Sequence, residues 1–510
     1  MRLFPLSLAL AFVVFISLDT MGQSVALPSA DTSGKIYQVE TNLVGTTQNE
    51  GDSPFTLKDR MARYKIKGVS IAVIRNYKIE WAKGYGWADE TTRNPVTDQT
   101  LFQAASISKS LNAVGVLKLA QEKKLDLYVD INNYLSTARL GANNRIDSYT
   151  LLNGSQLNWK FPYDSLSKGK KITIANLLSH TGGLTVHGFG GYERGTDIPN
   201  IVQILDGTPP ANSAKIRSMY EPGLKSEYSG GGITISQLIV MNTTHMAYEK
   251  YMYENVLEPM GMTSSTFSQF PRRDKRALYA TAYDADGKEI SGKYHIYPEQ
   301  AAAGLWTNPT DLAKYIIETQ LALDGKSAKV LDQQWTKTRV TPYLDKSAAL
   351  GVFIDNRDDT KYFGHGGANE GFRSQYYGSF EDGNGVVIMV NSDNGGIIPE
   401  IVNSVAKVYG FKGLYRSKVI KAVKFSANLL DSYTGKYEIK PDLFIMVTRQ
   451  GERLYGQPTG QGKYLLLPVT ENKFSLNYAD TQIEFIKDDN GAVTKAVVYQ
   501  NGPHDAKKVN

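Results

Sequence analysis

The 510-residue sequence contains no cysteine, which excludes disulfide bonds, thiolate nucleophiles and cysteine-ligated metal sites. Histidine is scarce too: there are six, and none stands in the spacing of a zinc motif. His180 and His187 are close enough in sequence to share a metal, but no carboxylate pattern accompanies them. We therefore expect that the protein needs neither a metal nor an organic cofactor.

The sequence also lacks a concentration of charge of one sign. Its formal net charge of +6 is small for this length, and lysine and arginine form no basic block. Proteins that bind nucleic acids carry such a block as a patch or a stripe. We therefore expect no nucleic-acid partner.

Long hydrophobic runs are absent beyond the N-terminus. Met1-Arg2 precede an apolar run from Leu3 to Leu18, and small and polar residues follow around Gly22-Gln23-Ser24. The run is shorter than the ~20 residues that span a bilayer, and its layout is typical of a secretory signal peptide. We predict a signal peptide over residues 1–23, an exposed polar lead-in over 24–55, no stable membrane span, and export to a bacterial periplasm or medium.

Two regions of the chain have strand patterns. Residues 68–74 and 78–86 are β-rich runs on either side of a short polar turn, which predicts a hairpin. The first run is almost continuously apolar, so we expect it to be buried on both faces. From 423 to 510 the pattern changes to short alternating runs separated by turns, which predicts a separate small all-β domain, a sandwich or a barrel.

The most informative stretch begins at Ser106. Apolar residues recur every three positions after it, at Leu111, Val114 and Leu117, which predicts a helix with one buried face. On a helix Ser106 and Lys109 stand at i and i+3, on the same side. A buried lysine with a lowered pKa can take the proton of a serine, so the pair is a candidate nucleophile and base.

Two later loops carry further candidates. Tyr228 stands between a Pro-Gly turn and a glycine run, which suggests close approach of the backbone to another group. His365-Gly366-Gly367 precedes a predicted hairpin, and its backbone N–H groups could receive a carbonyl oxygen. His180 is an alternative base, but Lys109 is the better candidate, and we interpret His180 as a local structural residue that ends a helix.

Ser106-x-x-Lys109, Tyr228-Ser229-Gly230 and His365-Gly366-Gly367, in this order, resemble the motifs of the serine β-lactamase and penicillin-binding-protein superfamily, in its class C-like branch. The resemblance covers roughly residues 55–410. It implies an α+β domain over 56–415, with an antiparallel sheet flanked by helices and a mostly helical insert. The segment around 433–437 resembles the lipocalin-like barrel of some of these hydrolases.

The resemblance also implies roles for individual residues. Ser106 would be the acylated nucleophile, Lys109 and Tyr228 would share the base and acid work, and His365 would stand where many relatives carry lysine. The backbone N–H groups of Ser106 and Ala368 would form the oxyanion hole. The expected substrate-binding backbone is that of Gly230, Gly366 and Gly367.

Three functions are compatible with these residues. The first is an exported serine hydrolase that works through a Ser106 acyl-enzyme on amides, such as peptides containing D-amino acids. The second is a carboxylesterase with the same residues. It gains weight because relatives usually carry asparagine where Gly230 stands. The third is a penicillin-binding protein without useful turnover, in which β-lactams act as acylating ligands. The sequence assigns no oligomeric state.

Overall fold

The computed structural model describes residues 30–50, 52–135, 159–270, 273–420, 425–460, 462–476, 481–500 and 502–509. The signal peptide expected over residues 1–23 lies outside them. The described residues contain no helix that is both long enough and apolar enough to cross a membrane.

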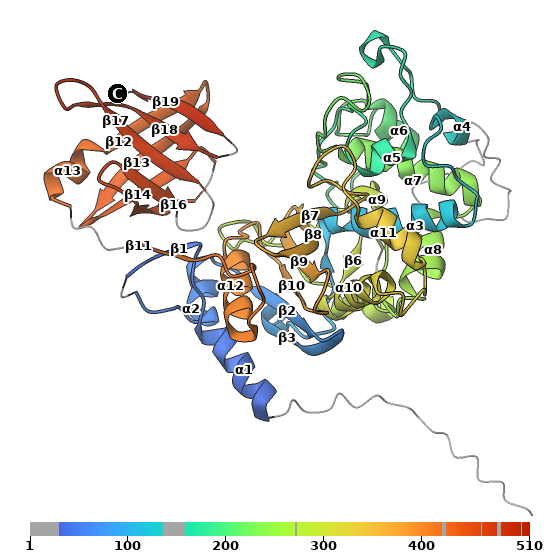
Figure 1. Cartoon of the computed structure of the whole chain (residues 1–510), viewed down its shortest axis with the longest axis horizontal. Coiled ribbons are helices and arrows are strands. Elements are labelled where there is room, and N and C mark those ends of the chain that lie inside the picture. Colours follow the sequence, from blue (N-terminus) through green and yellow to red (C-terminus); the bar gives the residue numbers. More distant parts are fainter. Residues whose placement is uncertain are drawn as a thin grey trace, which may run out of the picture.

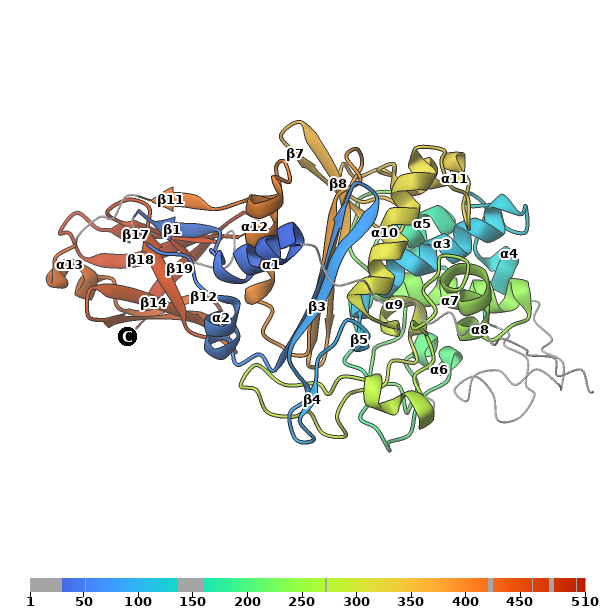
Figure 2. The same ribbon diagram turned by 90° about the horizontal axis from the view of Figure 1, so that it is seen from below.

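Within the described residues, seven strands form one antiparallel sheet in the order β4-β3-β2-β10-β9-β8-β7 (Figure 2). The predicted hairpin is confirmed as β2 paired with β3. The strands are β4 (Asn94–Pro95), β3 (Lys78–Asp89), β2 (Gly68–Arg75), β10 (Gly385–Val390), β9 (Phe372–Ser379), β8 (Thr360–Asn369) and β7 (Phe353–Arg357).

The central strands of the sheet are buried on both faces, as the apolar run in β2 predicts. Because side chains alternate along a strand, Ile71 and Val73 pack on one face, while Ala72 and Ile74 pack on the other. Helices α1 (Ala30–Thr41) and α12 (Ile397–Tyr409) cover the first face, and α10 (Pro309–Leu323) covers the second (Figure 2).

The helices between β5 (Phe102–Gln103) and β7, with the loops that join them, form the larger core on the second face of the sheet. The predicted fold class, an antiparallel sheet flanked by helices with a mostly helical insert, is confirmed. The α-helices of this region are α3 (Ser108–Gln121), α4 (Asn132–Leu135), α5 (Ile174–Leu178), α6 (Ile201–Asp206), α7 (Gly230–Thr244), α8 (Tyr248–Met252), α9 (Gln300–Ala303), α10 and α11 (Gln333–Val340). Its shorter elements are 3-10 turns at Ala105–Ile107, Ser165–Ser167 and Arg273–Leu278, a π-helical turn at Tyr253–Leu257, and β6 (Trp306–Thr307), which pairs with β5.

The expectation of an exposed lead-in over residues 24–55 does not hold for the buried residues that the structure describes within it. Helix α1 buries Ile36 and Val39 against the sheet domain, and Leu43 follows them into the same core. These apolar residues stand at i, i+3 and i+7, so one face of the helix is apolar although the segment is polar on average. Further along, β1 (Thr47–Asn49) pairs in parallel with β11 (Lys418–Ile420), and α2 (Leu57–Arg63) leads into the sheet.

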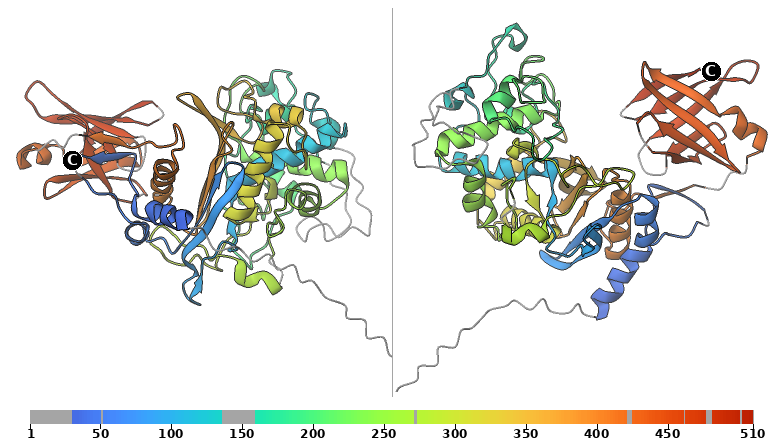
Figure 3. Two further views of the ribbon diagram at one scale, coloured as in Figure 1. Left: turned by 60° about the horizontal axis from the view of Figure 1, so that its bottom comes forward. Right: turned by 180° about the vertical axis from the view of Figure 1, so that it is seen from behind.

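Beyond β11, eight of the described strands close into an antiparallel barrel, which follows the short helix α13 (Ala427–Ser432) and lies beside the sheet domain (Figures 1 and 3). The prediction of a small all-β domain is confirmed. Side chains fill its interior, among them Tyr433, Tyr437 and Phe485. The strands are β12 (Gly435–Lys440), β13 (Leu443–Gln450), β14 (Arg453–Pro458), β15 (Tyr464–Pro468), β16 (Lys473–Leu476), β17 (Gln482–Lys487), β18 (Val493–Tyr499) and β19 (Pro503–Val509).

Candidate active site

Ser106 lies in the 3-10 turn Ala105–Ile107, directly before α3. The sequence places it on the helix; in the structure the α-helix begins two residues later, at Ser108. Ala105 has a φ of +51°, a left-handed conformation that costs a non-glycine residue free energy and is found often at functional sites. The turn is held from outside, because the backbone N–H of Leu305 donates to Ser108 Oγ at 2.9 Å.

Lys109 lies one turn further along and points back at Ser106. Its Nζ lies 2.9 Å from Ser106 Oγ and 2.7 Å from the carbonyl oxygen of Ala302, at the end of α9. The side chain is buried, and within the described residues it forms no ion pair. Burial without a counter-charge lowers the pKa of Lys109 to about 7. Near neutral pH a large share of Lys109 is therefore an uncharged amine.

Tyr228 approaches the same two groups from the loop before α7. Its ring lies 4.9 Å from Lys109 Nζ, and it lines the same cavity as Ser106. Burial raises the pKa of Tyr228 to about 12, so the phenol keeps its proton at neutral pH. Ser229 fixes the end of this loop as the N-cap of α7, because its Oγ accepts the N–H of Gly232.

Gly230 is the first residue of α7, and a phenylalanine occupies the space beside it. A Cβ added to Gly230 would lie 3.0 Å from the ring of Phe189 and 3.2 Å from the carbonyl oxygen of His187. The His187 ring also hydrogen-bonds the carbonyl oxygen of Tyr228. The loop that carries His187 and Phe189 therefore packs where a longer side chain at Gly230 would extend.

Strand β8 forms the opposite wall of the site. Its pairing with β7 ends at Gly364, so beyond this point that side of β8 faces the Ser106 turn instead of a strand. A Cβ at Gly367 would lie 2.2 Å from the carbonyl oxygen of Ala104, so only glycine lets the strand approach the turn this closely. Gly366 and Ala368 line the same cavity as Ser106.

His365, at the start of this stretch, is buried beside Tyr228, with 6.2 Å between the ring centroids. Its Nδ1 lies 2.6 Å from the carbonyl oxygen of Gly366 and donates to it, because a carbonyl only accepts. Its Nε2 is buried without a hydrogen-bond partner. Burial, reinforced by the charge of Lys109, lowers the pKa of His365 to about 3. The ring is therefore neutral, with Nε2 as an acceptor.

His180 contacts residues of the candidate active site, although the sequence predicted only a local structural role for it. Its ring packs against Tyr228 with 4.4 Å between centroids, and its Nδ1 accepts the backbone N–H of Ser229 at 3.2 Å. These partners are far away in sequence, so the expectation of a locally bonded ring is wrong. Burial, with the charges of Lys109 and His365 as further causes, lowers the pKa of His180 well below its usual value. Its backbone is left-handed, with a φ of +60°.

Ser106, Tyr228 and His365 open into one cavity of about 530 Å³. Its remaining walls come from residues that carry no motif and that the sequence did not single out. Phe353 lies against the rings of both Tyr228 and His365, and the start of β9, with residues at and before the start of α12, closes the rest. These wall residues are Phe353, Arg373, Ser374, Gln375, Gly395, Ile398 and Pro399.

Comparison with known proteins agrees with this architecture. The family model described as Beta-lactamase matches residues 56–398. Protein flp of Staphylococcus aureus (strain N315) is 23% identical over 416 residues, which cover 78% of this chain and 72% of the relative. Penicillin-binding protein 4* of Bacillus subtilis (strain 168) is 21% identical over 437 residues, which cover 82% of this chain and 90% of the relative.

Solved structures share the fold at low sequence identity. The octameric penicillin-binding protein homologue from Pyrococcus abyssi has a TM-score of 0.58 and 20% identity, covering 88% of this chain and 98% of its own. The D-amino acid amidase from Ochrobactrum anthropi SV3 has a TM-score of 0.54 and 19% identity, covering 75% of this chain and 99% of its own. The family match extends over most of the chain, and the chain belongs to the Beta-lactamase family of serine hydrolases.

Proposed function

We propose that the protein is an exported serine amidase or peptidase that acts through a Ser106 acyl-enzyme on peptides containing D-amino acids, or on related amides. The observation that carries the proposal is the contact of 2.9 Å between Ser106 Oγ and the buried amine of Lys109. No metal or cofactor takes part in the proposed steps.

In the proposed first step Lys109 is the general base. Its uncharged amine donates one N–H to the carbonyl oxygen of Ala302, which leaves its lone pair free to accept the Ser106 Oγ proton. Ser106 Oγ then bonds to the substrate carbonyl carbon, and the carbonyl electron pair moves to the oxygen. The pKa of about 7 supports this role, because the amine is substantially deprotonated at neutral pH and still basic enough to take a proton.

The negative oxygen would be held by the backbone N–H groups of Ser106 and Ala368. Two observations support this: both residues line the cavity, and Gly367 brings β8 against the turn before Ser106. Removal of one such donor typically costs about 10²–10³ in kcat. Gly366 and Gly367 would present further backbone to the substrate, and Gly230 would add backbone at the start of α7.

Tyr228 would be the general acid for the leaving group. Its phenol keeps its proton at neutral pH and lines the same cavity as Ser106, which fits transfer to a departing nitrogen. An amine leaving group needs that proton more than an alcohol does, so this feature favours amides. Breakdown of the tetrahedral species expels the amine, and water then attacks the acyl-enzyme with the same residues acting in reverse.

His365 would assist from the β8 side as a neutral residue. Its unpartnered Nε2 can accept a hydrogen bond from a donor in the cavity, and a neutral imidazole provides no charge for a substrate carboxylate. This supports substrates that place a hydrogen-bond donor, and not a carboxylate, beside His365.

A carboxylesterase is the second candidate, and one observation favours it. Phe189 occupies the space beside Gly230, so this position offers no side-chain amide to hold the amide of a substrate. A penicillin-binding protein without turnover is the third candidate. The contacts among Ser106, Lys109 and Tyr228 support a working enzyme over this alternative.

Export and domain boundaries belong to the same proposal. A signal peptide over residues 1–23, a hydrolase domain over 56–415 and a lipocalin-like domain over 423–510 would give a bacterial protein of the periplasm or medium. The layout of Met1 to Leu18 supports export. N-terminal sequencing of the secreted protein tests it: a mature chain that retains Met1 would contradict the proposal.

The decisive experiment is the intact mass of the purified protein after exposure to penicillin and, separately, to a fluorophosphonate. We expect a covalent adduct in the wild type and none in Ser106→Ala. A penicillin adduct that persists would indicate the non-turnover alternative, and one that decays would indicate a hydrolase. The absence of any adduct in the wild type would contradict the Ser106 mechanism.

Matched substrates then separate amidase from esterase. D-Phenylalanine amide and D-phenylalanine methyl ester share one acyl group, and their L enantiomers test the preference for D-amino acids. We expect hydrolysis of the D-amide that Tyr228→Phe slows more than it slows hydrolysis of the D-ester. Hydrolysis of the esters alone would replace the first function by the second.

A further inference from the structure

A second cavity lies away from the active site, at the edge of the sheet that carries β4. It has a volume of about 750 Å³ and shares no residue with the cavity of Ser106. Four separate parts of the chain form it: the β3–β4 turn, the loop at Arg194, Phe270 with residues 276–281, and residues 293–294. Its size lies in the range of small-molecule sites, which is about 300–1,000 Å³.

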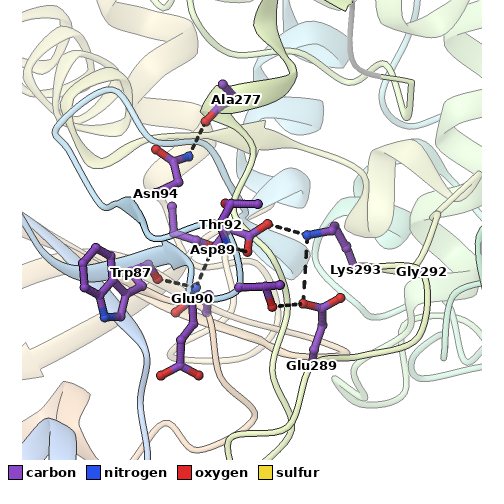
Figure 4. A network of polar contacts seen from close by, with 12 residues as sticks. Trp87, Asp89, Glu90, Thr92, Asn94, Ala277, Glu289, Gly292 and Lys293 are labelled. Carbon is purple, nitrogen blue, oxygen red and sulfur yellow. Dashed lines mark hydrogen bonds and ion pairs between the residues drawn. The ribbon is translucent and has the colours of Figure 1, made fainter.

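The acidic side chain in this cavity is already neutralised. Asp89 forms an ion pair with Lys293, and Glu289 lies 4.0 Å from the same Lys293 Nζ (Figure 4). Asp89 also accepts the backbone N–H of Thr92 at 3.1 Å. Burial opposes ionisation of Asp89, but the hydrogen bonds and charge of Lys293 outweigh it and lower the pKa of that carboxyl. Asp89 is thus bound to Lys293 and is not available to pair with other cations.

Three arginines line the remainder of the cavity. Arg93 and Arg276 form no ion pair with any part of the chain that the structure describes. Arg194 donates to the carbonyl oxygen of Gly292, and its guanidinium lies 4.7 Å from the ring centroid of Tyr294. This stacking fixes the plane of one guanidinium while leaving most of its N–H groups free.

Two phenols add further donors to the wall. Neither the hydroxyl of Tyr279 nor that of Tyr294 has a hydrogen-bond partner among the described residues, and both rings border the cavity. Burial raises the pKa of both phenols, so they stay protonated and can donate. The cavity therefore offers guanidinium and phenol donors, and its one carboxylate is occupied.

We infer that this cavity binds an anionic ligand that carries at least two phosphate or carboxylate groups. Arginine matches either group because its planar N–H fork binds two oxygens at once. Arg93, Arg194 and Arg276 come from three segments that meet at this cavity, so a ligand with several oxyanion groups can bind more than one of them at once. The site is independent of the hydrolase chemistry proposed for Ser106.

Isothermal titration calorimetry on the full chain tests this site with two probes, inorganic tripolyphosphate for phosphate and citrate for carboxylate. The test variant is Arg93→Gln with Arg276→Gln. The control is Arg453→Gln with Lys463→Gln, which removes the same charge from the exposed surface of the barrel. We expect one bound probe per chain, with affinity reduced about tenfold or more in the test variant and unchanged in the control.

The probe that binds identifies the oxyanion group of the ligand: tripolyphosphate indicates phosphate, and citrate indicates carboxylate. Failure of both probes to bind the wild type, or equal loss of affinity in test and control variants, would overturn the inference. Fluorophosphonate labelling of Ser106 verifies that each variant is folded. Arg194→Gln is a second variant in the same cavity, and it should weaken the same probe.

Discussion

Two buried basic side chains of this protein, Lys109 and Arg60, differ in whether a carboxylate lies beside them. Lys109 forms no ion pair with the described residues, and burial lowers its pKa to about 7. Arg60, on α2, is bound by both carboxylate oxygens of Glu400, on α12. Burial opposes its charge too, but Glu400 outweighs burial, and the pKa of Arg60 is raised.

The comparison shows that burial has different consequences for Lys109 and for Arg60. An unpaired buried lysine gives up its proton and becomes a base, whereas a paired arginine stays charged and ties two distant segments together. The Arg60 pair joins the N-terminal α2 to the C-terminal α12, and Tyr64 donates to Glu400 at 2.8 Å in the same cluster. Burial without a carboxylate suits Lys109 to the proposed role of a base, and the Arg60–Glu400 pair links two helices that are distant in sequence.

The largest effect is expected from Lys109→Arg. An arginine stays charged at all accessible pH values, so it cannot take the Ser106 proton, and we expect kcat/KM to fall by about 10²–10⁴-fold. Lys118→Arg on the same helix is the control, because Lys118 pairs with Glu122 at the surface. Wild-type activity in Lys109→Arg would contradict the assignment of the base.

The next effect is on stability. Glu400→Ala leaves Arg60 buried without its partner, and we expect the free energy of unfolding to fall by about 3–5 kcal/mol. Urea unfolding measures it, with Glu254→Ala at the surface as control. The Arg60→Met, Glu400→Met double variant should lose less than Glu400→Ala. An equal or larger loss would show that the pair does more than neutralise Arg60.

Lys109→Met should raise the free energy of unfolding, whereas Glu400→Ala should lower it. The pKa of the lysine is 10.5 in its ordinary state and about 7 in the fold, so between these values the unfolded chain binds more protons. The free energy of unfolding of the wild type should therefore rise relative to that of Lys109→Met as pH rises from 7 to 10.5. Below pH 7 the wild type should be less stable than Lys109→Met by the largest amount. A difference that does not change with pH would contradict the lowered pKa.

The wild-type pH profile provides a smaller test of the same group. We expect kcat/KM to rise with pH and level off above an apparent pKa of about 7, because Lys109 must be deprotonated to act. Below that pKa the rate should fall about tenfold per pH unit. A profile with no inflection near 7 would indicate a different base.

The smallest effect is expected from His180, which acts through Tyr228 as a positioning residue. His180→Ala removes the ring packed on Tyr228, and we expect kcat to fall about tenfold, or about 1.4 kcal/mol, with KM little changed. His180→Phe keeps a ring there and should recover part of kcat. A loss expressed wholly in KM, or no recovery with phenylalanine, would contradict positioning.

The features that could be predicted from the sequence depend on residues that are close together in the chain. Ser106 and Lys109 are three residues apart, so the 3-10 turn and the first turn of α3 bring them to one side. The β2–β3 hairpin depends on one short turn. Alternating residues beyond 423 predicted strands, though not whether they form a sandwich or a closed barrel. Helix α1 was missed because average polarity concealed its apolar face.

What the sequence by itself determined is therefore the motif residues, their order and the class of fold. Only the tertiary structure decided their chemistry. The protonation of Lys109 depends on burial beside Ala302, and the neutrality of His365 depends on burial near Lys109. Such effects arise from groups distant in sequence that exclude water together, and no local pattern records them. The same holds for the arginine-lined cavity, whose charges meet only once the chain is folded.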